Sequence, residues 1–278
     1  LEMESISRRY GVGRAAVMAV KAGADMVLTP WSERKKAEVY AALLEAVRSG
    51  ELSHARVEES VRRILTVKLR RGLFDAPRPD EERLAELSKP RRRDVAARIA
   101  RESVTLVRAD SRFFPLAAGK RLGVITAEPA LAQAISARSP GAHVLLVPRY
   151  PKPEQRARLL ERAREVARNS DLVVVGVFNS RQLELVRAAA SSGKPVTVVS
   201  MGLPYLVEQV PEAKAVLALY SFRRSSAEAG VAALFGEQGT PGKLPVSLKQ
   251  FPFGHGLNPV GEAMLSESTR QRDRTALP

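Results

Sequence analysis

Short, uninterrupted apolar runs alternate with segments of helical period through the second half of the chain. These runs do not alternate between polar and apolar residues, which is typical of parallel strands that are covered on both faces. Strands are predicted at 122–126, 144–147, 172–177, 196–200 and 215–219, and helices at 129–137, 154–169, 181–190 and 225–235. Crossovers of this length form right-handed βαβ units, so the sequence predicts an open, doubly wound α/β domain with a mostly parallel sheet.

Two further segments flank this alternation. A helix is predicted at 93–107, with Val95, Ile99 and Leu106 on its core face. Arg91, Arg98 and Arg101 are expected near one another on its surface. A glycine- and proline-rich turn at 239–243 is expected to lead into a short strand that ends at Val246. The polar stretch 259–278 has the composition of a disordered tail.

The first 75 residues predict a different arrangement. Helical patterns cover 14–21, 33–48 and 53–72, with Ser32 and Ser53 as predicted N-caps, and a short buried strand is expected at 25–28. The segment 76–92 contains three prolines and few large apolar residues, which indicates a linker. The expected organisation is therefore a first domain at 1–75, a linker at 76–92 and an α/β domain at 93–258.

Composition excludes several functional classes. The chain has no cysteine, so disulfides, thiolate metal sites and a cysteine nucleophile are excluded. No apolar run reaches the roughly 18–20 residues that a membrane span needs. The net charge of +15 is compatible with nucleic-acid binding. However, Glu161 lies among Arg158, Arg164 and Arg168 at helical spacing, which favours solvated helix faces and predicts no nucleic-acid partner.

The residues alone do not assemble a catalytic site. Gly11 and Gly13 lack the third glycine of a dinucleotide-binding motif, and no P-loop occurs. The three histidines, His54, His143 and His255, are far apart in sequence, and their spacing does not suggest a metal site. His255 lies between two glycines, and both a loop-packing role and a catalytic role remain open for it.

A series of strings carries more specific information because of its order. The strings are LEM (1–3), AVKAGADM (19–26), SGEL (49–52), VEESVRRIL (57–65), RGLF (71–74), ARIARESVTL (97–106), FPL (114–116), GKLPV (242–246) and FGHGL (253–257). In this order they resemble glycoside hydrolase family 3, and most closely its two-domain β-N-acetylglucosaminidase branch. The resemblance implies the last βα units of a (β/α)8 barrel at 1–75, followed by a complete α/β sandwich domain.

The resemblance also implies a reaction. Family 3 enzymes are retaining, exo-acting hydrolases that cleave terminal β-linked sugars through a glycosyl-aspartate, and the branch that this chain resembles points to β-N-acetylglucosaminides. The family's nucleophile sits in a string resembling T-D-A-L-E-M, which places it two residues before Leu1, and the branch's acid/base group is also expected upstream. The chain alone is therefore expected to be inactive, without a cofactor or metal, and to need the rest of the barrel as a covalent or associated partner.

Barrel geometry suggests substrate contacts at the ends of strands. Met3 and Trp31, which follow the expected seventh and eighth strands, and His255 are the candidate sugar-binding residues. The alternatives are a β-glucosidase or β-xylosidase of the same family, or a non-catalytic α/β module that binds carbohydrate or a partner. The cellular location is left open by the sequence.

Overall fold

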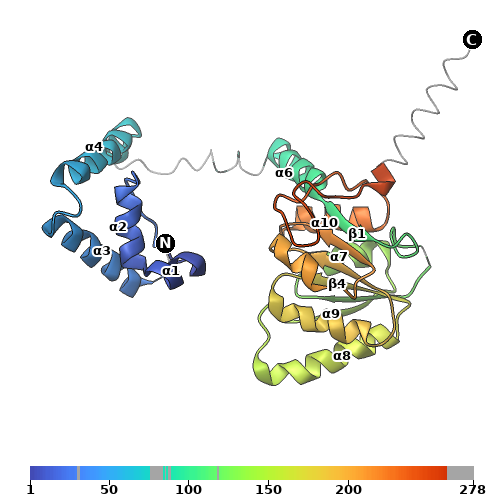
Figure 1. Cartoon of the computed structure of the whole chain (residues 1–278). Helices are drawn as coiled ribbons and strands as arrows, with labels where there is room; N and C mark the ends of the chain where they lie inside the picture. Colours follow the sequence, from blue (N-terminus) through green and yellow to red (C-terminus); the bar gives the residue numbers. More distant parts are fainter. Residues whose placement is uncertain (30–31, 76–83, 85, 87–88, 118, 262–278) are drawn as a thin grey trace, which may run out of the picture. The chain divides into compact units, whose positions relative to one another are not determined.

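The computed structural model describes residues 1–29, 32–75, 84, 86, 89–117 and 119–261. The chain divides into two compact units, an N-terminal unit (Leu1–Leu84) and a C-terminal unit (Ala85–Pro278) (Figure 1). The boundary falls inside the segment 76–92 that the sequence analysis assigns to a linker, and residues 76–83, 85, 87 and 88 of that segment lie outside the described residues.

The described part of the N-terminal unit is helical. It contains α1 (Glu4–Tyr10), α2 (Val12–Lys21), α3 (Glu33–Arg48), α4 (His54–Arg70) and the 3-10 turn η1 (Leu73–Asp75). The predicted serine caps are present, because Ser32 Oγ accepts a hydrogen bond from the Lys35 N–H at 3.3 Å and Ser53 Oγ accepts one from Arg56 at 3.2 Å. Helices α2 and α3 pack closely at Gly13, where an added Cβ would lie 2.9 Å from the Ala42 Cβ.

The predicted buried strand at 25–28 is wrong. The backbone there forms no ladder, and the side chains of Met26 and Leu28 are 67% and 76% exposed. The physical reason is that a strand needs a neighbouring strand for its backbone hydrogen bonds, and the described residues of this unit contain no strand with which 25–28 could pair. Helix α1, which the sequence analysis does not predict, occupies the segment before α2.

The C-terminal unit is built on a six-stranded sheet with the order β1-β6-β5-β4-β2-β3. The strands are β1 (Thr105–Ala109), β2 (Leu122–Thr126), β3 (His143–Leu146), β4 (Leu172–Val177), β5 (Val196–Ser200) and β6 (Ala215–Ala218). Strands β2 to β6 are parallel to one another, and β1 pairs antiparallel to β6. This confirms the predicted α/β fold with a mostly parallel sheet.

Helices cover both faces of this sheet (Figure 1). The helices are α6 (Pro90–Ser103), α7 (Pro129–Arg138), α8 (Arg156–Arg168), α9 (Leu183–Ala190) and α10 (Arg224–Leu234), with 3-10 turns η2 (Pro153–Gln155), η3 (Ser180–Gln182) and η4 (Pro204–Gln209). Helices α8 and α9 contribute to one apolar core, and α6, α7 and α10 contribute to the other.

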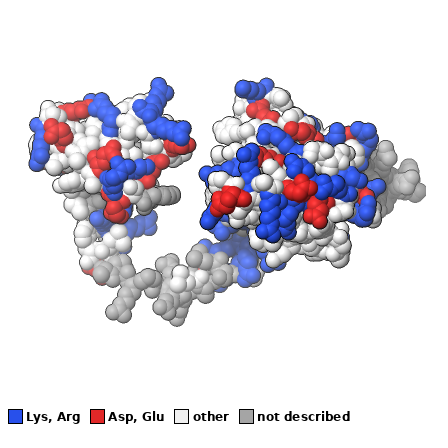
Figure 2. Space-filling model, turned by 90° about the horizontal axis from the view of Figure 1, so that it is seen from below, with Lys and Arg blue, Asp and Glu red and all other residues white. Residues whose placement is uncertain are grey.

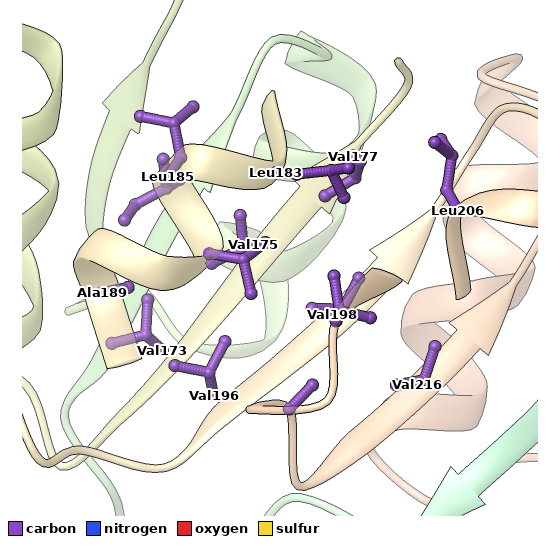
Figure 3. Packing of buried hydrophobic residues seen from close by; sticks show 14 of the residues in the cluster. Val173, Val175, Val177, Leu183, Leu185, Ala189, Val196, Val198, Leu206 and Val216 are labelled. Atoms are coloured by element: carbon purple, nitrogen blue, oxygen red, sulfur yellow. The ribbon is translucent and has the colours of Figure 1, made fainter. Parts of the chain in front are cut away.

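Strand β4 shows why the apolar runs are unbroken. Val173 and Val175 pack in the core with Leu185 of α9 (Figure 3), whereas Val174 between them packs in the opposite core with Leu131 of α7. Successive side chains of a strand point to opposite faces, and here both faces are covered. Burial of every β4 residue therefore requires an apolar side chain or a glycine at each position.

Helix α6 ends earlier than predicted. It stops at Ser103, and residues 105–109 form edge strand β1, because the segment after Ser103 is rich in β-branched residues and pairs with β6. The prediction that Val95 and Ile99 face the core is also wrong, since these side chains are 44% and 60% exposed. Leu106 is buried as predicted, but it lies in β1 and not in the helix. The buried position of this helix is Ala100, a small residue that allows close packing against α10.

The segment after α10 is an extended loop. Its predicted strand at 244–246 is wrong, because Pro245 has no N–H to donate to a ladder. The loop is nevertheless tied to the sheet, since the Gly242 N–H donates to Val104 O at 3.0 Å and the Leu257 N–H donates to Leu106 O at 2.8 Å. Residues 259–261 are helical and Val260 packs on the core, while 262–278 of the predicted tail lie outside the described residues.

Candidate functional site

A crevice of about 580 Å³ opens at the carboxyl ends of β4, β5 and β6 in the C-terminal unit. We call it the strand-end crevice. Its lining comes from the segments that directly follow these strands, namely Phe178, Asn179 and Ser180, then Met201, Gly202, Leu203 and Leu206, then Tyr220, Ser221, Phe222 and Arg223. In doubly wound sheets, ligands bind at the carboxyl ends of the strands, near the point where the strand order reverses. Here that reversal lies between β2 and β4.

A buried ion pair stands beside the crevice. The carboxylate of Glu128, which follows β2, accepts hydrogen bonds from Arg149 Nε at 2.8 Å and from Arg149 Nη2 at 2.7 Å. The Arg149 guanidinium also lies over the rings of Phe178 and Phe222, 4.8 and 4.4 Å from their centroids. The hydrogen bonds to Glu128 raise the pKa of Arg149. These contacts connect the segments after β2, β3, β4 and β6.

The turn after β4 has its own support. The side-chain oxygen of Gln182, which is fully buried, accepts hydrogen bonds from the Phe178 N–H at 2.6 Å and the Asn179 N–H at 3.3 Å. Asn179 Nδ2 in turn donates to the Arg149 carbonyl at 2.9 Å. Gly202 passes so close to this turn that an added Cβ would lie 2.1 Å from Phe178 O. The wall of the crevice is therefore defined by tightly packed backbone.

Tyr220 lies in the lining with an unusual backbone. Its φ is +57°, and within the part of the chain that the structure describes it is the one residue besides glycine in this region. A non-glycine residue in a left-handed conformation costs about 1–2 kcal/mol. The phenol donates a hydrogen bond to Thr105 Oγ1 at 2.9 Å, and burial raises the pKa of Tyr220. This bond fixes the ring between strand β1 and the crevice.

The chemistry available in the crevice is that of binding. None of its lining residues carries a carboxylate, and the neighbouring Glu128 is paired with Arg149. Among the described residues, no group of three or more histidine, aspartate or glutamate side chains is placed to hold a metal ion. Aromatic side chains, hydroxyls and the guanidinium of Arg223 are the groups that line the crevice.

Of the three predicted sugar-binding residues, His255 lies in the C-terminal unit, and it is not among the residues that line the crevice. The Met3 carbonyl accepts hydrogen bonds from the first turn of α1, its side chain is 73% exposed, and Trp31 lies outside the described residues. His255 Nε2 lies 2.7 Å from the Val107 carbonyl oxygen, and its ring stacks on Phe251 at 4.9 Å. His255 therefore makes contacts that join its loop to β1.

The sequence analysis did not single out the residues that form the crevice. Phe178, Tyr220 and Phe222 follow predicted strands within a few residues, as do Glu128 and Arg149. The position of a residue directly after a parallel strand is the signal that could have identified them.

Several charged side chains on helices α8 and α9 are paired. Arg164 and Arg168 of α8 lie 3.1 and 2.9 Å from Glu161, and Arg156 lies 2.5 Å from Glu184 of α9. Figure 2 shows acidic side chains between the basic ones on the visible face of the C-terminal unit. This pattern is that of solvated helix faces, and the absence of nucleic-acid binding stays a prediction. In the described residues, no helix has the length and apolar character to cross a membrane.

Comparison with known families assigns the chain. Residues 104–271 match the Glycosyl hydrolase family 3 C-terminal domain. The chain belongs to glycoside hydrolase family 3. Residues 1–67 match the family's N terminal domain, so both parts of the family 3 chain are represented in the expected order. The family resemblance of the sequence strings is thereby confirmed.

Individual relatives span several activities within the family. A family 3 β-N-acetylglucosaminidase from Paenibacillus sp. has 28% sequence identity and a TM-score of 0.64 over 87% of this chain and 49% of its own. A β-xylosidase from Formosa agariphila and a periplasmic β-glucosidase from Salmonella typhimurium are 24% and 25% identical, each over 88% of this chain. The chain spans 40% of the length of each of these two curated relatives.

Proposed function

We propose that the protein to which this chain belongs is a retaining, exo-acting glycoside hydrolase that releases terminal β-linked sugars, above all β-N-acetylglucosamine. The observation that carries this proposal is the match of both family 3 domains in order, at 1–67 and 104–271. The solved β-N-acetylglucosaminidase with 28% identity supports the choice of sugar.

The described residues favour a model in which the catalytic groups and part of the substrate contacts come from different segments of the whole protein. Most retaining hydrolases use two carboxyl groups about 5–5.5 Å apart, one as nucleophile and one as acid/base. The strand-end crevice offers no carboxylate among its lining residues. We therefore expect the nucleophile in sequence upstream of Leu1, as the family resemblance implies, and we assign substrate contacts to the C-terminal unit.

The N-terminal unit supports the expectation that further barrel segments cover it. A groove of about 630 Å³ runs along α4, lined by Val57, Val61, Leu65, Leu69 and Phe74. Four of these five side chains are between 45% and 70% exposed. Soluble monomers rarely expose large contiguous apolar patches, so the remainder of the barrel is the proposed partner for this surface.

The experiment uses the whole protein with 4-nitrophenyl β-N-acetylglucosaminide, β-glucoside and β-xyloside. We expect the N-acetylglucosaminide to be hydrolysed fastest, and proton NMR of the first product to show the β-anomer. Faster hydrolysis of the glucoside or xyloside would support the second candidate, which the Formosa and Salmonella relatives favour. An α-anomer as first product would contradict the retaining mechanism.

The 278-residue chain serves as the control. It should release no 4-nitrophenol above background, because loss of a catalytic carboxylate removes most of the rate. Clear turnover that disappears on changing a single Asp or Glu of this chain would contradict an upstream nucleophile. If the whole protein hydrolyses none of the three substrates, a non-catalytic carbohydrate-binding module becomes the better assignment.

A further inference from the structure

We infer that the strand-end crevice binds a saccharide that carries an anionic substituent, a carboxylate or a phosphate, and that Arg223 holds this charge. The saccharide part of the inference rests on the proposed function. The anionic part rests on the residues of the C-terminal unit alone.

Arg223 is the cation in the lining without a carboxylate partner. Among the described residues it takes part in no ion pair, and its guanidinium lies over the Phe222 ring, 5.3 Å from the centroid. Its neighbours differ in this respect, because Arg224 lies 2.8 Å from Glu228 and Arg149 is paired with Glu128. The lining therefore carries one positive charge and, among its described residues, no negative one.

The backbone next to Arg223 reinforces this polarity. Arg223 is the N-cap residue of α10, and no side chain caps the first turn of this 11-residue helix. Free N–H groups and the helix dipole favour an anion at such an end. Ser221, two residues before Arg223, also lines the crevice, and its Oγ accepts a hydrogen bond from the Arg223 N–H at 3.1 Å. The N–H groups of the first turn that follow Arg223 have no side-chain cap.

The rest of the lining suits the apolar face of a sugar ring. Phe222 and Phe178 meet edge to face at 88°, with centroids 5.3 Å apart, and Tyr220 lies beside them in the lining. Binding sites of this kind combine apolar and aromatic walls with a few polar groups that orient the ligand. The packing of Arg149 against the Phe178 and Phe222 rings fixes the positions of these two rings in the absence of a ligand.

A second basic concavity provides an internal comparison. It has a volume of about 540 Å³ and lies at the amino ends of β5 and β6, whereas the strand-end crevice lies at the carboxyl ends. Its lining includes Arg187, Lys194 and Lys214. Glu212 also lines it, 3.9 Å from Arg187 Nε. Lys194 therefore offers a matched control for binding that depends only on positive surface charge.

The test measures binding to the 278-residue chain by isothermal titration calorimetry. The probes are methyl β-D-glucuronide, glucose 6-phosphate, methyl β-D-glucoside and inorganic phosphate. A charge-assisted hydrogen bond is worth enough that at least one of the two anionic sugars should bind about tenfold or more tightly than the glucoside. Arg223→Gln should abolish this difference, and Lys194→Gln should preserve it.

Several results would overturn the inference. Equal affinities for the neutral and anionic sugars would do so, as would equal losses in Arg223→Gln and Lys194→Gln. If inorganic phosphate binds as tightly as both anionic sugars, the saccharide part is wrong. Arg223 is exposed, so an unchanged unfolding midpoint should accompany its replacement. Hydrolysis of neutral aryl glycosides by the whole protein is a separate readout, so either proposal can fail without the other.

Discussion

Arg149 and Glu128 form a two-bond ion pair, at 2.8 and 2.7 Å, that joins the segments following β3 and β2. The Glu128 side chain is 5% exposed, whereas that of Arg149 is 35% exposed. The carboxylate has thus been removed from water, and Arg149 is its compensating charge. The same guanidinium lies over the Phe178 and Phe222 rings, so this pair supports two aromatic residues of the strand-end crevice.

Arg149→Met should destabilise the C-terminal unit. Removing one partner of a buried pair leaves an uncompensated charge, and the partial exposure of Arg149 lowers the expected cost to about 2–3 kcal/mol. Urea unfolding followed by circular dichroism measures this change. The double variant Arg149→Met/Glu128→Gln should recover part of the loss, because no charge is then left buried. Arg224→Met, at an exposed i,i+4 ion pair with Glu228, is the control and should change stability little.

Gly202→Ala should be poorly tolerated. An added Cβ would lie 2.1 Å from the Phe178 carbonyl oxygen, so the backbone after β4 or β5 must move. Overpacking of this kind costs about 1–3 kcal/mol or more. Gly141→Ala is a matched control, since a Cβ added there would meet no atom within 4 Å and the φ of Gly141 is not in the left-handed region. Equal unfolding midpoints for the two variants would contradict the close approach of Gly202 to Phe178.

The Asp171 carboxyl should stabilise the C-terminal unit in a pH-dependent manner. Hydrogen bonds from the Arg121 side chain and backbone lower the pKa of Asp171 from 3.8 to about 2. A lowered pKa stabilises the fold above pH 3.8, and this contribution is lost as the pH falls through about 2. The stability difference between the parent chain and Asp171→Asn should therefore be constant above about pH 5 and disappear near pH 2. A difference that grows with acid would contradict this sign.

Limited proteolysis should separate the two units. The N-terminal unit has two small cores, around Val17 and Ala16, and exposes Leu28, Leu65 and Phe74. The C-terminal unit has an extensive core on each face of its sheet. We expect a resistant fragment that begins near residue 90, and faster cleavage within the first 75 residues. Equal protection of both regions would show that the N-terminal unit is stable without further barrel segments.

The local sequence determined most of the secondary structure of the C-terminal unit. Strands β2, β4 and β5 have the predicted bounds, because burial on both faces requires a mainly apolar run without alternation, which is visible in the sequence. Helix α3 also has its predicted bounds, with Ser32 as the cap. These features depend on residues that are neighbours along the chain. The barrel origin of the first 75 residues and the expected reaction came from the resemblance to family 3.

Features that depend on distant segments were decided by tertiary structure. Edge strand β1 forms because β6 offers it a ladder, whereas residues 25–28 remain without strand pairing because no neighbouring strand is present among the described residues of their unit. Ile99 is exposed although it has the spacing of apolar residues on one helix face, because that spacing does not specify which other element will cover the face. The crevice combines residues 178 and 222, which are brought together by the order of strands in the sheet. Backbone propensity and patterning are local, whereas strand order, edge pairing and the environment of Arg149 follow from contacts between residues far apart in the chain.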